Sequence, residues 1–435
     1  MDQKLTVALL NDSFPPTIDG VANTVVNYAS VIERKYGHAI VATPDYPGVQ
    51  DDYPFEVLRY PSLDTTKLVG YRFGLPLNIN FISQFPNKNV DIIHSHCPVS
   101  SNFLARGLRD TIRKPIVMTY HTKFDIDIRK AVNMKLIQDA AIKALVDSIS
   151  ACDEVWAVSK GAGENLKSLG YKGDYIVMPN GVDFEKGKAS KQAIEELSNE
   201  YLLRSDVPVY LFVGRMMWYK GLKIILDALK ILQDQGKQFV MIFVGSGMDK
   251  EEVEQYAIDL QLMRHCRFIG PVRDRNRLKA FYSRADLFLF PSTFDTNGIV
   301  VGEAAASGLA SVLIRGSCAA EEVTENRNAF LIEENAESLA QFLLRHGDQL
   351  DYLHQIGTNA MNEIYVSWED SIANAVARYP EVIKKFEYQA PNLLNGTMMD
   401  NIIKTSGDMA TALDLVHKVN TTISTSINEV LDRWL

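Results

Sequence analysis

Two acidic side chains, Asp295 and Glu303, stand eight positions apart in a stretch rich in small and apolar residues. On a single helix this spacing would separate them by about 12 Å, because each residue adds about 1.5 Å along the axis. Two carboxyl groups that act on one glycosidic bond lie closer together, at roughly 5 to 9.5 Å. We therefore expect the two acids to have separate roles. For either residue alone, the simpler interpretation is a loop aspartate or a surface glutamate.

A turn from a strand into a helix is expected to carry these acids. Residues 287–290 are apolar and are followed by Pro291, which is typical of a buried strand that ends at a sheet edge. The alanine-rich run 298–307 predicts a helix, with Asn297 as its N-cap and Gly308 as its stop. The backbone N–H groups and the dipole at such a helix start favour phosphate or a polar sugar.

Two cations, Arg215 and Lys220, occur in the segment Gly214-Arg-Met-Met-Trp-Tyr-Lys-Gly221, which follows an expected strand and precedes an expected helix. This placement would direct both side chains to the crevice that residues 297–300 line. There they would neutralise a diphosphate leaving group as a glycosidic bond breaks. A pair of solvated surface cations is the alternative.

An alternation of strand and helix patterns predicts an α/β protein with doubly wound sheets, and 435 residues are many for a single core. The expected strands are short apolar runs. In the first series they cover residues 5–10, 39–43, 55–59, 91–94, 115–120, 154–158 and 175–178, and in the second 209–213, 239–244, 267–269, 287–290, 311–314 and 329–332. The turn segment Pro179-Asn-Gly-Val-Asp183 separates the two series, so we expect the domain boundary near residue 183.

The first expected strand leads into a turn-rich loop, residues 11–21, before a helix. Ligands of doubly wound sheets bind at the carboxyl ends of the strands, where this loop lies. The loop carries a single glycine shortly before the helix, Gly20, preceded by Asp19. A glycine in such a loop allows the backbone to approach a ligand closely.

These features together resemble glycosyltransferase family 4, whose members are retaining enzymes with the GT-B fold. The acidic-x7-Glu spacing of Asp295 and Glu303 matches the family signature, and the Gly-Arg-x4-Lys-Gly segment matches its phosphate clamp. The resemblance implies that Asp295 lies against the donor sugar and that Glu303 binds the nucleotide ribose. The family usually has Glu at the first position, and the Asp side chain is shorter by about 1.5 Å of reach.

Further donor contacts follow from the resemblance. His121 matches the position that reaches the donor sugar, and Val272 lies where the family recognises the base through backbone groups. The implied catalytic residues are Asp295, Arg215, Lys220 and His121, and the implied donor-binding residues are Gly20, Gly214, Val272, Asn297, Gly298, Ile299, Val300 and Glu303. No metal or other cofactor is expected, since the cations and the helix start can carry the diphosphate charge.

The architecture that the resemblance implies is GT-B, with two Rossmann-like doubly wound domains that face a cleft. Residues 1–183 would bind the acceptor, and residues 184–365 would bind the nucleotide sugar. Residues 366–388 would form a helix that crosses back to the first domain, and 389–435 a helical tail. The implied reaction moves a hexose, glucose in our interpretation, from a UDP-linked donor with retention of configuration.

A membrane lipid such as diacylglycerol is the acceptor that we expect. Nine basic residues against four acidic ones fall within residues 102–143, and such a patch attracts anionic headgroups. The mixed aromatic, apolar and basic loop 65–76 suits an interface and looks similar to the acceptor-side loop of glycolipid-forming bacterial members such as diacylglycerol glucosyltransferases. The alternative is a solvated basic face, with a soluble glycan or a small molecule as acceptor.

Composition limits the cellular location and the kinds of partner that we expect for this protein. The chain has no amino-terminal signal pattern and no run of about 18 apolar residues, so we expect it in the cytoplasm, peripheral on the inner face of the membrane. A net charge of −9 without a basic face interleaved with aromatics argues against nucleic acid as a partner. The four cysteines are scattered, which suits reduced thiols.

Two other kinds of site have weaker patterns. His94-Ser-His96 has the spacing of two metal ligands on one strand, but a third ligand is not evident. Asp125-Ile-Asp127 has the Asp-x-Asp pattern of GT-A glycosyltransferases, but it does not directly follow a buried strand.

Other functions stay open beside the transferase. A catalytically silent GT-B binding or scaffold protein would fit Asp295 and the single Gly20, and a non-hydrolysing nucleotide-sugar epimerase would share the fold. Residues 408–435 predict a helix with apolar residues spaced by three and four and with Asn420 where the pattern skips. Self-association through this helix and docking on its own body are the two interpretations.

Overall fold

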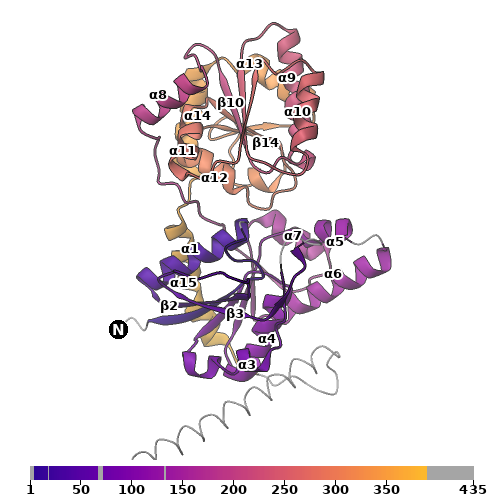
Figure 1. Cartoon of the computed structure of the whole chain (residues 1–435), viewed down its shortest axis with the longest axis vertical. Helices are drawn as coiled ribbons and strands as arrows, with labels where there is room; N and C mark the ends of the chain where they lie inside the picture. The colour runs from indigo at the N-terminus through magenta and orange to yellow at the C-terminus, as the bar shows by residue number, and fades with distance from the viewer. Residues whose placement is uncertain (1–3, 18, 67–71, 132–133, 389–435) are drawn as a thin grey trace, which may run out of the picture. The chain divides into compact units, whose positions relative to one another are not determined.

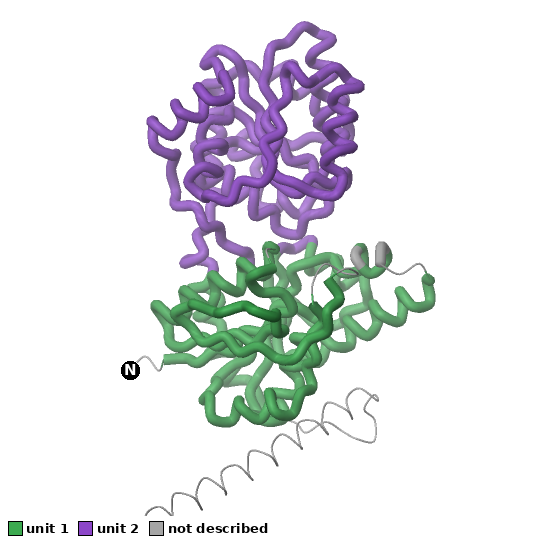
Figure 2. The backbone as a smooth tube through the Cα atoms, in the orientation of Figure 1, with its two compact units in different colours: residues 1–158, 162–178, 372–435 green, residues 159–161, 179–371 purple. Residues whose placement is uncertain are grey.

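The computed structural model describes residues 4–17, 19–66, 72–131 and 134–388 (Figure 1). The chain forms two compact units, which Figure 2 distinguishes by colour. Unit 1 comprises residues 1–158, 162–178 and 372–435, and unit 2 comprises residues 159–161 and 179–371. The expected tail and its two interpretations lie outside the described residues.

Unit 1 is built on a seven-stranded sheet in the order β3-β2-β1-β6-β7-β8-β9. Its strands pair in parallel and are β1 (Leu5–Leu10), β2 (Gly37–Pro44), β3 (Glu56–Tyr60), β6 (Ile92–Ser95), β7 (Ile116–Tyr120), β8 (Glu154–Ala157) and β9 (Ile176–Val177). A short antiparallel pair, β4 (Ser62–Leu63) and β5 (Phe73–Gly74), lies apart from it. Continuous apolar runs form these strands because both faces of a parallel sheet are covered.

The helices of the first half of the chain connect these strands. They are α1 (Gly20–Lys35), α3 (Ile79–Ile82), α4 (Ser100–Ile112), α5 (Phe124–Ala131), α6 (Lys135–Ser150) and α7 (Lys160–Ser168). Leu104 and Leu108 of α4 pack with Ala8 and Leu10 on one face of the sheet. Tyr28 of α1 contacts His94 of β6 edge-on, at a centroid distance of 5.5 Å, so α1 covers the other face.

Unit 2 is built on a six-stranded parallel sheet in the order β12-β11-β10-β13-β14-β15. Its strands are β10 (Val209–Val213), β11 (Val240–Val244), β12 (Cys266–Gly270), β13 (Leu287–Phe290), β14 (Ser311–Ile314) and β15 (Phe330–Ile332). Its helices are α8 (Lys191–Glu200), α9 (Leu222–Asp234), α10 (Lys250–Asp259), α11 (Arg275–Arg284), α12 (Ile299–Ala306), α13 (Ala336–His346) and α14 (Leu350–Glu363). Figure 1 shows α9, α10 and α13 on one side of this sheet and α8, α11 and α14 on the other.

Helix α15 (Trp368–Lys385) returns the chain from unit 2 to unit 1. Its Tyr379 is fully buried, donates or accepts a 2.7 Å hydrogen bond with His94 Nδ1 and stacks on Trp156 at 5.6 Å. Arg378 forms a salt bridge of 2.7 Å with Glu154 of β8. The last described helix therefore completes a sheet face whose other residues come from the start of the chain.

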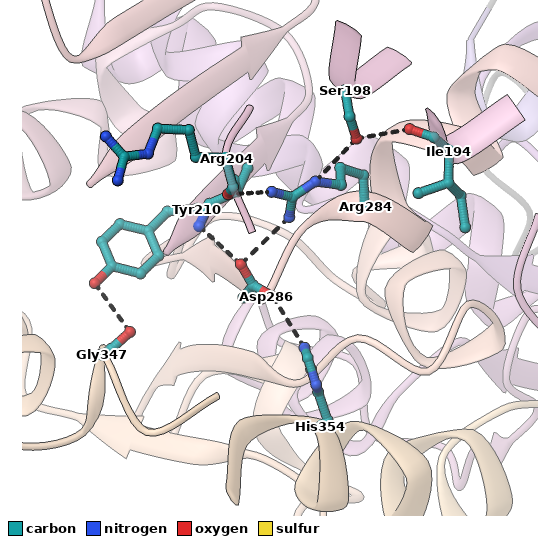
Figure 3. A network of polar contacts seen from close by, with 9 residues as sticks. Ile194, Ser198, Arg204, Tyr210, Arg284, Asp286, Gly347 and His354 are labelled. Carbon is teal, nitrogen blue, oxygen red and sulfur yellow. Dashed lines mark hydrogen bonds and ion pairs between the residues drawn. The ribbon is translucent and has the colours of Figure 1, made fainter. Parts of the chain in front are cut away.

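The amino-terminal edge of the unit 2 sheet is held by Asp286, the residue before β13 (Figure 3). Its Oδ2 accepts a 2.9 Å hydrogen bond from the Val209 amide at the start of β10, and its Oδ1 lies 2.9 Å from His354 Nε2 of α14. The Arg284 guanidinium lies 3.5 Å from Oδ2 and also donates to the Arg204 carbonyl. This carboxylate thus fixes two strands and a helix at one point.

Candidate active site

Lys220 lies at the end of the loop that follows β10, in the short 3₁₀ helix η2 (Trp218–Lys220). It is buried, with 7% exposure, and its ammonium group contacts the Asp295 carboxylate. Ser292 donates a 2.6 Å hydrogen bond to the other Asp295 oxygen. The structure therefore brings together two of the predicted catalytic residues, from loops 75 positions apart in the sequence.

Glycines allow three loops at this carboxyl edge to pack backbone against backbone. Gly221 has φ +76°, and a Cβ there would lie 2.0 Å from the Pro291 carbonyl oxygen. A Cβ at Gly245 would lie 1.9 Å from the Gly214 oxygen, and one at Gly247 would lie 2.3 Å from the Met216 oxygen. No side chain could fit at these three positions without displacing backbone. The loops after β10, β11 and β13 thus form one rigid surface around Lys220.

Helix α12 begins later than the sequence predicts, and the predicted Asn297 cap is wrong. Gly298 occupies the N-cap position with φ +63° and ψ +52°, and no side chain of the described residues caps the helix. This left-handed conformation is accessible to glycine at little cost, so the turn selects Gly298 over Asn297 for the cap. The amides of Ile299 and Val300 open the helix without a side-chain acceptor, which leaves the helix start suited to an anion.

Glu303 of α12 lies in a buried acid and base cluster. One of its oxygens accepts a 2.6 Å hydrogen bond from Arg275, and the other accepts a 2.9 Å bond from the Tyr282 hydroxyl. Burial raises the pKa of Glu303, although the neighbouring Arg275 opposes this shift. Arg275 also lies 3.6 Å from Asp183. Each carboxylate oxygen can accept a second bond, so a ligand hydroxyl can still be recognised here.

Sequence reasoning did not single out Arg275 or Tyr282. Both lie on α11, with Arg275 as its first residue after the Asp274 N-cap. The stretch around Val272, which is half-buried, was expected to act through its backbone alone. A strand end followed by a helix that starts with Arg is the signal that could have indicated a partner for the buried Glu303.

Two of the predicted clamp residues are not engaged with Lys220. The Arg215 side chain is exposed and forms no hydrogen bond or ion pair with the parts of the chain that the structure describes. Gly214 donates its amide to the Val244 carbonyl at 3.0 Å and so ties the ends of β10 and β11 together. A role for Arg215 at the diphosphate stays a prediction.

Gly20 is the first residue of α1 rather than a residue of the preceding loop, and its expected approach to the diphosphate stays a prediction. The Asp19 carboxylate caps this helix and accepts hydrogen bonds from the Val21 and Ala22 amides at 2.8 and 2.7 Å. Asp at an N-cap satisfies these amides and complements the helix dipole. This helix start is therefore already occupied by a side chain of the protein.

His121 follows β7 at the carboxyl edge of the unit 1 sheet and is buried, with 6% exposure. Its Nε2 lies 3.0 Å from His96 Nδ1. Burial lowers the pKa of His121 to about 3, so its ring is neutral at physiological pH. It can exchange hydrogen bonds with a ligand but not supply a positive charge.

The metal interpretation of His94 and His96 is wrong. His94 uses both ring nitrogens within the protein, at 2.7 Å from the Tyr379 hydroxyl and 2.7 Å from Thr119 Oγ1. Within the described ranges, no group of three or more His, Cys, Asp or Glu side chains is arranged to hold a metal ion.

The GT-A interpretation of Asp125 and Asp127 is also wrong. Both residues lie on helix α5 rather than at a strand end, and the Asp125 carboxylate accepts a hydrogen bond from Asn165. The two parallel sheets likewise differ from the single-domain arrangement that this interpretation requires.

Two family models match the chain side by side. The model described as Glycosyltransferase Family 4 matches residues 18–186, and the model described as Glycosyl transferases group 1 matches residues 193–362. The two matches meet close to the division between the units at residues 178 and 179. Each half of the chain thus corresponds to one domain of a known type.

Curated relatives carry glycosyltransferase names. The chain is 23% identical over 312 residues to alpha-monoglucosyldiacylglycerol synthase of Streptococcus pneumoniae, covering 70% of each protein. It is 22% identical over 368 residues to the protein of the same name from Acholeplasma laidlawii, covering 82% of this chain and 92% of that relative.

Solved structures have the same fold. Sucrose-phosphate synthase of Thermosynechococcus elongatus superposes with a TM-score of 0.71 at 18% identity, over 88% of this chain and all of that chain. The Anabaena protein HepE in complex with UDP-glucose superposes with a TM-score of 0.68 at 19% identity, with the same coverage. The fold, the two family domains and the named relatives lead to one conclusion: the chain is a GT-B hexosyltransferase that resembles the glycolipid-forming bacterial members of glycosyltransferase family 4.

Proposed function

We propose that the enzyme transfers glucose from UDP-glucose, with retention of configuration, to a membrane lipid such as diacylglycerol. The observation that carries the donor half is the Lys220–Asp295 pair beside the uncapped start of α12. This edge combines a buried cation, a carboxylate and amide donors that no described side chain caps, which suits a sugar diphosphate. The relatives named alpha-monoglucosyldiacylglycerol synthase support the acceptor.

In this proposal unit 2 binds the donor and unit 1 binds the acceptor. Lys220 and Arg215 neutralise the diphosphate as it leaves, together with the amides of Gly298, Ile299 and Val300. Asp295 accepts hydrogen bonds from hydroxyls of the transferred sugar, and Lys220 holds it in position. These groups bring their charges to the reaction without a metal ion.

Glu303 binds the ribose of the nucleotide, in the remaining acceptor positions of its two oxygens. Arg275 and Tyr282 fix the orientation of this carboxylate, so it need not reorganise when the nucleotide binds. Asn297, Gly214 and Val272 complete the donor-binding set, and His121 contacts the sugar from unit 1.

Basic residues expected to share one membrane patch lie at opposite edges of the unit 1 sheet. Arg109, Arg113 and Lys114 lie where α4 ends and β7 begins, whereas Lys123 and Arg129 follow the other end of β7. Arg109 is also paired with Asp153 at 2.5 Å. A single patch of nine charges is therefore wrong, because the strand separates the two groups.

The group beyond the carboxyl end of β7 has the composition of a membrane-contacting surface. At the start of α6, Met134, Leu136 and Ile137 expose 61%, 79% and 48% of their surface beside the exposed Lys135. Exposed apolar side chains with basic neighbours insert into a headgroup region and attract anionic lipids. We assign contact with the bilayer to this helix start, with the enzyme peripheral on the inner face of the membrane.

A second exposed apolar group belongs to the β4–β5 pair, where Leu63, Phe73 and Leu75 expose 54%, 40% and 40% of their surface. Ser100 at the start of α4 donates a hydrogen bond to the Gly74 carbonyl, so this pair lies at the carboxyl edge of the sheet. The expected acceptor loop 65–76 follows β4 and includes β5, and residues 67–71 lie outside the described residues.

In the described ranges no helix has the length and apolar character needed to cross a bilayer.

The donor is tested by incubating the purified enzyme with UDP-, GDP- and ADP-hexoses and diacylglycerol in vesicles, followed by product analysis with assignment of the anomeric configuration. We expect an α-linked glucolipid from UDP-glucose. Transfer only to a soluble glycan or small molecule would replace the lipid acceptor, and binding of UDP-glucose without turnover would favour the silent scaffold protein.

The membrane surface is tested by co-sedimentation with vesicles that contain anionic lipid at low salt. Leu136→Asp should reduce the bound fraction several-fold, because it places a charge where we expect lipid. Leu202→Asp is the matched control, since Leu202 is equally exposed, at 80%, but belongs to unit 2. Equal losses in the two variants would contradict the assigned surface.

A further inference from the structure

Three histidines of unit 1 form a buried row at the carboxyl edge of its sheet. His94 is in β6, His96 follows that strand, and His121 follows the neighbouring strand β7. The rings of His94 and His96 lie 4.1 Å apart, and those of His96 and His121 are stacked at 5.2 Å. All three are at most 6% exposed. The row thus runs from the core to the side chain expected at the donor sugar.

The protonation of this row is constrained by burial. Burial lowers the pKa of His94, of His96 and of His121. At neutral pH each ring therefore carries a single N–H and a single acceptor nitrogen. The 3.0 Å contact between His96 Nδ1 and His121 Nε2 requires one proton between the two nitrogens.

Two arrangements of that proton are possible, and they differ at the far nitrogen of His96. His96 Nε2 is buried and has no hydrogen-bond partner in the part of the chain that the structure describes. If His121 donated to His96, the proton of His96 would sit on Nε2 as a buried N–H without an acceptor. If His96 donates from Nδ1, only a lone pair is left unpaired. Buried N–H groups without partners are the rarer and costlier case.

We propose that His96 is a positioning residue that donates its Nδ1–H to His121 and thereby fixes His121 as the Nδ1–H tautomer. With Nε2 accepting from His96 and the proton on Nδ1, His121 takes no part as a proton acceptor in the reaction. The contact with the sugar rests on the proposed function, whereas the tautomer depends on the protein alone. The pair orients the ring before the donor binds, which reduces the reorganisation that binding requires.

His94 supports His96 from the core side. Its two nitrogens are fixed by Tyr379 and Thr119, and Tyr28 packs edge-on against both His94 and His96 at 5.5 and 5.1 Å. Tyr379→Phe therefore removes a partner of the row without changing the His96–His121 hydrogen bond, and it provides a matched control.

The tautomer is measured directly by long-range ¹H–¹⁵N spectra of the full chain labelled at histidine, with His121→Gln used to assign the resonance among the eight histidines. We expect the Nδ1–H pattern for His121 in the wild type, in His96→Asn and in Tyr379→Phe. His96→Leu removes the donor and should shift His121 towards the Nε2–H form. An Nε2–H pattern in the wild type would overturn the proposal without any reference to enzyme activity.

Kinetics provides the second measurement. His96→Leu should lower kcat/KM for UDP-glucose by about 10-fold, the scale of one lost buried hydrogen bond, mainly through a higher KM. His96→Asn offers an amide donor at the same distance from the backbone and should recover activity to within about 3-fold of wild type. Equal losses in the Asn and Leu variants would contradict a positioning role. Absence of transfer in the wild type would reject the proposed function and leave the tautomer test standing.

Discussion

Two aspartates at opposite ends of one strand show how the same side chain can be used in two ways. Asp286 precedes β13 and Asp295 follows it, and each carboxylate meets a cation and a second hydrogen-bond donor. The Asp286 side chain is 7% exposed and is shared between Arg284, His354 and the Val209 amide. The Asp295 side chain is 20% exposed and has Lys220 and Ser292.

The two sites differ in which charged and hydrogen-bonding groups stay available to a ligand. The contacts of Asp286 join β10, β13 and α14, so its charge stabilises the fold. Asp295 and Lys220 belong to loops at the carboxyl edge, where the start of α12 is uncapped. A parallel sheet therefore has one edge that is closed by its own residues and another that offers charges and amides to a substrate.

Of the variants that test this comparison, Lys220→Ala should have the largest effect on activity. Turnover is expected to fall at least 100-fold, because removal of one preorganised charge donor costs about 3 kcal/mol of transition-state stabilisation. The variant should remain folded, since Asp295 keeps Ser292 and access to water. Initial rates with saturating UDP-glucose measure this. Arg215→Ala is expected to act in the same direction, and wild-type turnover in a folded double variant would remove both residues from the mechanism.

Asp295→Asn should lower kcat by roughly 10- to 100-fold, the scale of hydrogen bonds to a charged group. Asn keeps the size of Asp but loses the charge opposite Lys220. Asp295→Glu retains the carboxylate and should keep part of the activity, which distinguishes the charge from the shape. Steady-state kinetics of the two variants side by side is the measurement. If Asp295→Ala were fully active, the residue would be only a loop carboxylate.

Asp286→Asn should show the opposite profile. We expect a loss of about 2 kcal/mol in the free energy of unfolding, because the charge that pairs with Arg284 and His354 is removed from a buried position. Urea unfolding of unit 2 measures the loss, and kcat per folded molecule should stay unchanged. A variant of normal stability with impaired turnover would contradict the purely structural role that we assign to Asp286.

Glu303→Gln should have the smallest effect and depend on pH. Burial raises the pKa of Glu303 above its ordinary value of 4.5, so folding favours its neutral form relative to the unfolded chain. The raised pKa therefore stabilises the folded protein fully below pH 4.5, and this stabilisation is lost as the pH rises through the pKa of Glu303 in the folded state. The Tm of Glu303→Gln relative to wild type should therefore increase from pH 4.5 to pH 8, while KM for UDP-glucose rises about 5-fold. A Tm difference independent of pH would contradict the assigned cause.

The strands were the most predictable part of this molecule. The expected ranges 5–10, 209–213, 287–290 and 311–314 coincide with β1, β10, β13 and β14, because short apolar runs bounded by turns have few alternatives in a parallel sheet. The same logic directed Lys220 to the crevice beside residues 297–300. The structure places it against Asp295, because both residues lie in loops that follow the neighbouring strands β10 and β13. Topology alone brings such loops to one edge.

Local capping and charge pairing could not be predicted. The choice of Gly298 over Asn297 depends on a left-handed backbone that the tertiary turn imposes. Asp19 was not expected to cap α1 and occupy the amides near Gly20. Arg275 contacts Glu303 only because α11 and α12 pack together. These outcomes depend on distances in space that spacing along the chain does not determine.

The return of α15 to unit 1 has a consequence for synthesis on the ribosome. His94 and its partner Tyr379 are separated by 285 positions, and the intervening chain includes all of unit 2. At roughly 5 to 20 residues per second, Tyr379 is added on the order of 10 to 40 s after residue 178. Trp156 and His94 of unit 1 therefore stay uncovered by α15 while unit 2 is translated and folds. The face under α15 is the part of the nascent protein that a chaperone has the longest opportunity to bind.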